Sequence, residues 1–234
     1  MIKINKIIPT ALLLTSISSA ALADNWNVGA SASYAKIDGT ARDTQTTGAG
    51  AIVAQDRGAT SGDANFPFAS IFVEYAKTLD KNLDLIIGLD YVPFKAEIDS
   101  KSFADLNTTG SVASNTSGTR KATLELENYA TLYLQPTYKI SGGTAVFGKV
   151  GYIHGDVQIS GSNTATGSTI NAKDTLNGYV VGLGVQHNIN KNVFVRLEGS
   201  FTAHDDVTAT DSLGTKFTAD SELIAGKLSI GYSF

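Results

Sequence analysis

The sequence has no cysteine, which excludes a disulfide framework, thiolate catalysis and cysteine metal sites. It is also short of positive charge, because 18 Lys and Arg against 22 Asp and Glu give a net charge of −4 without any basic run. An acidic chain of this kind argues against nucleic acid as a partner. After residue 23, no stretch reaches the roughly 18 apolar residues of a membrane-spanning helix. Any later membrane crossing must therefore use strands.

The first 23 residues have the order of a secretory signal peptide. Two lysines lie within the first six residues, residues 7–17 are mostly apolar but too short to span a bilayer, and the segment ends on Ala21-Leu22-Ala23. This ending predicts cleavage between Ala23 and Asp24. We therefore expect export through the inner membrane and a mature domain of residues 24–234.

The mature sequence alternates between apolar and polar side chains in eight segments, each long enough for the roughly 9–11 residues of a tilted membrane strand. Three connections between them are tight and rich in Asn, Gly and Lys, whereas four are long and rich in Thr, Ser, Gly and Asp. Short turns at one end and long loops at the other are typical of an outer-membrane barrel. The predicted strands are residues 26–37, 66–79, 83–98, 124–140, 144–159, 176–189, 193–203 and 223–234, and the long loops are about 39–65, 99–123, 160–175 and 204–222.

Hairpin register supports these strands. When the first tight turn is centred on Lys81, Val73 faces Leu89 on one side of the sheet and Glu74 faces Gly88 on the other. Turns centred on Gly142 and Lys191 give the same separation of apolar from polar or small residues. A slip of one residue would destroy this agreement, because it would move every side chain to the opposite face.

The apolar face is too bulky to fill a small barrel, and the other face is too polar to meet lipid. A charged side chain on the lipid face costs about 2–4 kcal/mol at the midplane. The sequence therefore predicts an all-β fold, an eight-stranded antiparallel up-and-down transmembrane barrel with its apolar face outward. A ten-stranded variant remains open if Gly50 to Gln55 pairs within the first long loop.

Six ionisable residues share the inward parity at similar distances from the tight turns. Three acids and three bases would balance in charge, which predicts a charge-paired plug in the lumen, although the stagger of a tilted barrel leaves the pairs undetermined. The alternative is a wet, loosely occupied interior. The predicted cluster is Glu74, Asp90, Lys149, Arg196, Glu198 and Lys227.

The last predicted strand ends on Phe234 and resembles the signal that bacterial outer-membrane proteins present to the barrel-assembly machinery. The resemblance assigns Lys227 to the polar position and Tyr232 and Phe234 to the hydrophobic ones, while Ser229 stands where glycine is usual. The mature chain as a whole resembles the small outer-membrane barrels, which include the outer-membrane protein A type, the X and W types and opacity-like surface antigens. The resemblance implies an integral protein of the bacterial outer membrane with lipid and the assembly machinery as partners.

The sequence contains no arrangement of residues that predicts catalysis, a metal site or a cofactor. Its three histidines are scattered, and the acids around Asp205 do not have the spacing of a calcium loop. We therefore expect a structural or surface-interaction barrel, not an enzyme, whose long loops meet an unidentified external ligand. A narrow porin-like channel for ions or small solutes is the alternative. The subfamily and the oligomeric state are left open.

Overall fold

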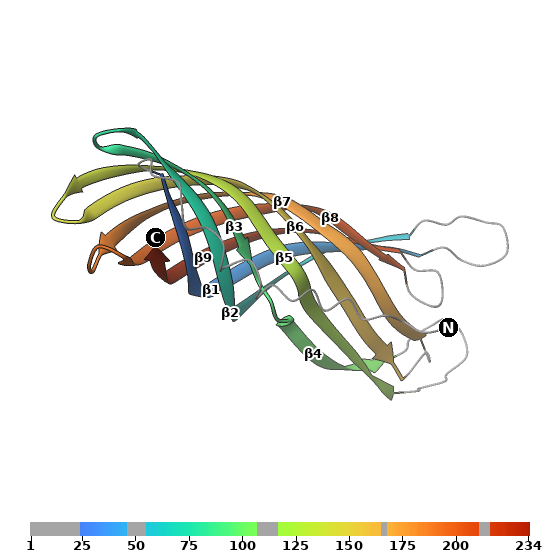
Figure 1. Cartoon of the computed structure of the whole chain (residues 1–234). Helices are drawn as coiled ribbons and strands as arrows, with labels where there is room; N and C mark the ends of the chain where they lie inside the picture. Colours follow the sequence, from blue (N-terminus) through green and yellow to red (C-terminus); the bar gives the residue numbers. More distant parts are fainter. Residues whose placement is uncertain (1–23, 46–54, 107–116, 165–167, 211–215) are drawn as a thin grey trace, which may run out of the picture.

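The computed structural model describes residues 24–45, 55–106, 117–164, 168–210 and 216–234, which form one antiparallel sheet (Figure 1). Among these residues, no helix has the length and apolarity needed to cross a membrane. The strands are β1 (Asp24–Gln45), β2 (Gln55–Asp80), β3 (Leu83–Tyr91), β4 (Ala96–Leu106), β5 (Ser117–Ser141), β6 (Thr144–Asn163), β7 (Ser168–Asn188), β8 (Val193–Thr210) and β9 (Lys216–Ser233).

The sheet closes on itself, because β1 pairs with both β2 and β9 and β3 pairs with both β2 and β5. Since β3 and β4 follow one another along β5, the ring has eight positions, and the predicted eight-stranded barrel is confirmed. Gln55 belongs to β2 and pairs with Gln45 of β1. The rest of the segment proposed for a ten-stranded variant, residues 50–54, lies outside the described residues.

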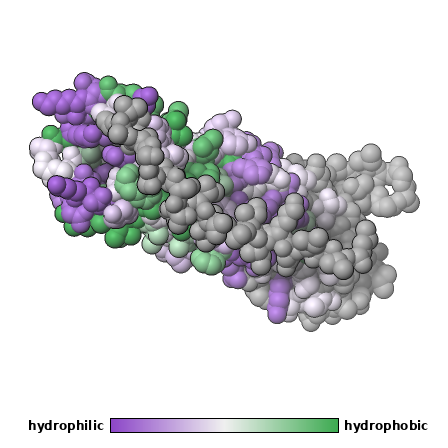
Figure 2. Space-filling view, viewed as in Figure 1, coloured by the Kyte–Doolittle hydropathy of each residue, from purple (hydrophilic) through white to green (hydrophobic). Residues whose placement is uncertain are grey.

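Side chains alternate between the two faces as predicted. Outward residues of β7, β8 and β9 are large and apolar, with Leu183 74%, Leu197 64% and Leu228 60% exposed. In Figure 2, hydrophobic residues gather on the outer surface beside a hydrophilic rim at the short-turn end. An apolar exterior of this kind is stable only against lipid, so the outer face is the membrane face.

The strands extend well beyond their predicted ends on the side of the long loops. The β1–β2 ladder continues to Gln45 and Gln55, and β5 begins at Ser117 where a loop to residue 123 was predicted. The predicted long loops were therefore too long. The residues at these ends are polar and rich in threonine, and they lack a continuous apolar face. The strand ladder persists in water, because no lipid is present to require an apolar side chain at every second position.

The predicted strand 83–98 is interrupted. The β2–β3 ladder ends at Ile71–Tyr91, and the next positions in the same register would pair Ala69 with Pro93 and Pro67 with Lys95. Proline has no N–H to donate, so each strand carries a residue that weakens further pairing. Beyond Tyr91, β4 pairs with β5, and no ladder joins it to β2 among the described residues.

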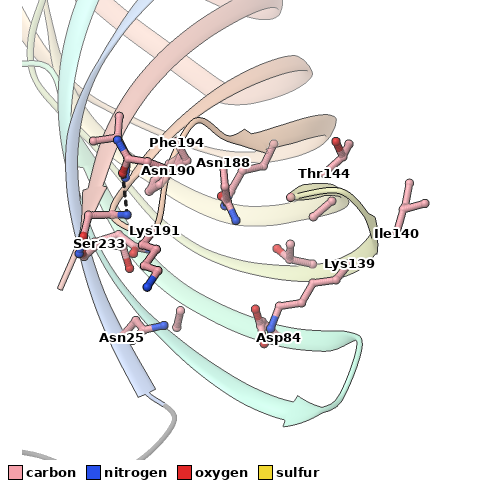
Figure 3. Close-up of a pocket in the computed structure, with 18 of the residues that line it drawn as sticks. Asn25, Asp84, Lys139, Ile140, Thr144, Asn188, Asn190, Lys191, Phe194 and Ser233 are labelled. Carbon is pink, nitrogen blue, oxygen red and sulfur yellow. Dashed lines mark hydrogen bonds and ion pairs between the residues drawn. The ribbon is translucent and has the colours of Figure 1, made fainter.

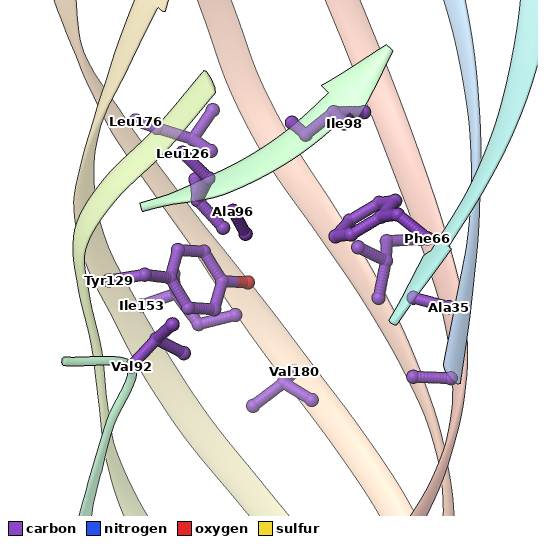
Figure 4. Close-up of a cluster of buried hydrophobic side chains, with 12 residues drawn as sticks. Ala35, Phe66, Val92, Ala96, Ile98, Leu126, Tyr129, Ile153, Leu176 and Val180 are labelled. Carbon is purple, nitrogen blue, oxygen red and sulfur yellow. The ribbon is translucent and has the colours of Figure 1, made fainter. Parts of the chain in front are cut away.

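An apolar core fills the lumen at the level of β4, toward the long hairpins (Figure 4). Its side chains come from almost every strand and include residues on both sides of the interruption, Val92 and Ala96. The core therefore packs as in a soluble β-barrel, although the same ring is lipid-facing nearer the short turns. Its members are Ala35, Phe66, Val92, Ala96, Ile98, Leu126, Tyr129, Ile153, Leu176, Val180, Leu223 and Ala225.

Candidate functional site

The structure brings the six inward ionisable residues together in the lumen as three ion pairs. The closest nitrogen–oxygen distances are 2.6 Å for Arg196–Glu74, 2.5 Å for Lys149–Glu198 and 2.9 Å for Lys227–Asp90. The pairs join β8 to β2, β6 to β8 and β9 to β3, none of which are neighbours in the ring. The Arg196–Glu74 and Lys227–Asp90 pairs each connect strands separated by two others and so reach across the lumen, whereas Lys149–Glu198 passes over Gly182 of β7 along the inner wall.

Glu74 is the most heavily bonded of these side chains and is 1% exposed. Arg196 binds both of its oxygens, at 2.6 and 3.1 Å. The Tyr133 hydroxyl donates to Oε1 at 2.6 Å and Asn27 Nδ2 donates to Oε2 at 3.1 Å. Arg196 in turn donates to Gln186 Oε1 at 2.8 Å. A buried ion pair is tolerable when its remaining donors and acceptors are satisfied in this way.

Aromatic rings lie against two of the three cations, Arg196 and Lys149. The Arg196 Cζ atom lies 4.9, 5.3 and 5.6 Å from the ring centres of Phe194, Phe147 and Phe72. Lys149 Nζ lies 4.3 Å from the ring centre of Tyr133. Cations over ring faces are attracted by the ring quadrupole, more strongly when water is excluded. The rings and the ion pairs together form a layer across the lumen, which we call the aromatic–ionic layer.

Each ring of this layer lies against a glycine directly opposite on the neighbouring strand. A Cβ atom at Gly88 would come within 2.3 Å of Tyr133 Cζ, and one at Gly231 within 2.2 Å of Phe194 Cζ. The glycines therefore create the space that lets each ring lie flat across the wall. The pairs are Gly29–Phe72, Gly88–Tyr133, Gly184–Phe147 and Gly231–Phe194.

Two cavities lie on either side of the aromatic–ionic layer. Toward the apolar core, a cavity of about 40 Å³ is lined by Asp90, Lys149, Glu198 and Lys227. This volume is enough for one or a few water molecules. Toward the short turns, a wider cavity of about 430 Å³ opens to solvent; we call it the cup (Figure 3). The lumen thus passes from the cup through the layer and the small cavity to the apolar core.

The three histidines lie apart, each with its own partner. His204 Nε2 is 3.2 Å from the Tyr129 hydroxyl, His154 contacts Asn177 and His187 contacts Thr144. His204 was predicted to start the last loop, but it lies inside β8, which continues to Thr210. The described residues contain no group of three His, Asp or Glu side chains placed to hold a metal ion.

An ionic network lies on the barrel beyond the lipid-facing band. Glu127 accepts from Lys95 and from Lys173, and Lys173 also pairs with Asp156 at 3.0 Å. The hydrogen bond from Lys95 lowers the pKa of Glu127, and that from Asn128 lowers the pKa of Asp156. These exposed pairs contribute little to stability. They join the segment before β4 to β5, β6 and β7 where the wall is interrupted.

The residues assigned to the assembly signal lie in β9 and just after it. Lys227 points inward to Asp90, whereas the rings of Tyr232 and Phe234 are 5.9 Å apart and exposed. The Phe234 amide donates to the Trp26 carbonyl at 3.0 Å, so the last residue is bound to the first described strand. Asp24 begins β1, while Ala21 and Ala23 lie outside the described residues.

We expect Phe234→Asp to impair assembly in cells much more than folding in detergent. The Phe234 backbone bonds survive the change, and the exposed ring is available to the assembly machinery. Surface level in cells, set against the yield of folded protein in detergent, measures the difference. Ile189→Asp is the control, since Ile189 is similarly exposed at the same end. Equal defects in both assays, or equal defects in both variants, would contradict a signal role.

A closed ring with a lipid-facing exterior and a filled, charge-paired lumen defines an integral outer-membrane barrel. The family model for the outer membrane protein beta-barrel domain matches residues 10–219. The chain belongs to this family and is located in the bacterial outer membrane. No curated protein matches the sequence.

Among the similar solved structures, OprG and OmpT show the same fold at low sequence identity. OprG of Pseudomonas aeruginosa is 13% identical with a TM-score of 0.54, covering 90% of this chain and 95% of its own. The outer membrane protease OmpT of Escherichia coli is 12% identical with a TM-score of 0.50, covering 90% and 97%. Ail, the attachment invasion locus protein of Yersinia pestis, is 13% identical with a TM-score of 0.43, covering 89% and 98%. The similarity to OprG and OmpT concerns the fold alone.

Proposed function

We propose that this protein is a structural and surface-interaction barrel with a sealed lumen. The observation that carries the proposal is the aromatic–ionic layer, in which three ion pairs between non-neighbouring strands and four inward rings fill the lumen. The barrel serves as a membrane anchor for hairpins that extend beyond the lipid band, where an external ligand would bind. Lipid and the barrel-assembly machinery are its other proposed partners.

Conductance in planar bilayers tests the proposal. A sealed lumen is expected to give no steady single-channel steps from purified wild-type protein. The insertion of folded barrel is verified independently, by the difference in gel mobility between unheated and boiled samples. Regular channel openings by inserted wild-type protein would contradict the sealed lumen.

A narrow channel for ions or small solutes is the second candidate. It is favoured by the two cavities, because only the layer around Arg196 separates the cup from the small cavity beyond it. Conduction by this path would require Arg196 to leave Glu74, and the apolar core to loosen as well. We favour the sealed barrel, since both barriers would have to open together.

We further propose that the protein is not an enzyme. The dispersed contacts of His154, His187 and His204 support this, because a general base needs a nucleophile or substrate within hydrogen-bond reach. Export with removal of residues 1–23 is part of the same proposal.

A further inference from the structure

The cup at the short-turn end is lined by polar side chains, most of which take no part in sealing the lumen. Seven of its lining residues carry carboxamide side chains. Its charged lining consists of the Lys139–Asp84 ion pair, at 2.8 Å, and Lys191 in the last tight turn. In barrels of this kind the short turns face the periplasm. We propose that the cup is a binding site for an N-acetylated sugar unit of a periplasmic glycan.

Several of these amides are already used by the fold. Asn190 Oδ1 accepts from the backbone of its own turn, Asn192 Nδ2 donates to the Ser233 carbonyl, and Gln186 bonds Arg196 and Asn188. These groups shape the cup but do not add capacity for a ligand.

Three amides retain that capacity. The side chains of Asn25 and Asn82 make no hydrogen bond among the described residues, and Asn188 keeps its Nδ2 donors because only its Oδ1 is engaged. They come from β1, the β2–β3 turn and β7, and Asn25 and Asn188 extend into the cup in Figure 3. A carboxamide offers both donors and acceptors, so a ring of them matches a neutral ligand that presents both kinds of group on several edges.

The floor of the cup explains why the sugar would be N-acetylated. Phe194, Ile86 and Ala145 lie there and are buried. An acetamido group presents a methyl to this apolar floor and an amide to the surrounding asparagines, whereas a plain hexose presents hydroxyls to both. The volume of about 430 Å³ lies within the range of small-molecule sites.

A peptide is the less suitable occupant. Extended peptides bind by adding a strand to a free sheet edge. The rim of the cup is made of three hairpin turns and the paired ends of β1 and β9. The cup therefore offers separate side-chain groups around a ring and no backbone ladder. The site does not depend on whether the lumen conducts, so the failure of either proposal leaves the other standing.

The test uses full-length mature protein in detergent micelles, labelled with ¹⁵N-asparagine and titrated with tri-N-acetylchitotriose. We expect saturable shifts of the Asn25, Asn82 and Asn188 side-chain amides, and little response to maltotriose. The variant Asn25→Ala/Asn82→Ala removes two amides that have no partner in the fold. It should weaken binding about tenfold, the loss expected for two neutral hydrogen bonds.

The matched control is Asn65→Ala, which removes an exposed amide of β2 away from the cup and should bind as the wild type does. An absence of shifts in the wild type would overturn the proposal. So would equal affinity in the double variant, or equal binding of maltotriose. Tighter binding of N-acetyl-trialanine amide would replace the glycan with a peptide and would also overturn it.

Discussion

Replacing Arg196 with alanine is expected to lower the free energy of unfolding by about 3–5 kcal/mol, the usual cost of leaving one partner of a buried ion pair alone. Glu74, which is 1% exposed in the wild type, would lose its two guanidinium bonds and keep only those from Tyr133 and Asn27. The change also removes the cation among three phenyl rings. Urea unfolding of the barrel in detergent measures the loss.

The same variant should show more open-channel events in planar bilayers than the wild type, since the cup and the small cavity would join and leave the apolar core as the remaining barrier. Arg196→Lys should recover only part of the stability, because an ammonium cannot bind both Glu74 oxygens as a planar fork does. Lys139→Ala is the matched control, since its pair with Asp84 lies in the exposed cup and should cost under about 1 kcal/mol. If Arg196→Ala matched Lys139→Ala in stability and conductance, the lumen would be wet and loosely occupied.

Replacing Gly88 with valine is expected to destabilise the barrel by about 3 kcal/mol or more, or to prevent its closure. Even the first added carbon would come within 2.3 Å of the Tyr133 ring. The ring can leave only by breaking its hydrogen bond to Glu74 and its contact with Lys149. The expected cost therefore combines overpacking with a damaged polar network. Urea unfolding and the heat-dependent gel shift measure it.

Gly226→Val is the control for this substitution. Gly226 also lies in the middle of a strand, but it faces outward and a Cβ there would meet nothing within 4 Å. Added apolar carbon on the lipid face should be neutral or slightly stabilising. Similar losses in both variants would show that the strand backbone requires glycine, and that the Gly88–Tyr133 contact is unimportant.

The sequence predicts the wall of this barrel better than its interior. Alternation and turn chemistry are local signals, and a register centred on Lys81 correctly pairs Val73 with Leu89 and Glu74 with Gly88. Local signals do not predict the ionic partner of Glu74, because Arg196 lies 122 residues away and reaches it across the lumen. Inward parity placed both residues in the lumen, but only the tilt and stagger of the closed ring bring them into contact.

The sequence predicted neither the inward aromatic rings nor the break between β3 and β4. Phe147, Phe194 and Tyr133 were not singled out from the sequence, although each faces a glycine once the register is known. Pro93 was visible, but alternation continued past it and masked the interruption. Proline alone would not have located the break, because Pro67 and Pro136 lie inside the continuous strands β2 and β5.

The interruption between β2 and β4 also determines where the barrel wall can open locally. Amides of a closed ladder exchange with solvent only when two neighbouring strands separate, whereas those beside the interruption lack that protection. The β4–β5 hairpin is therefore attached to the ring along one edge and to the apolar core beneath it. It is the part of the wall that can open while the ladders around the aromatic–ionic layer stay intact.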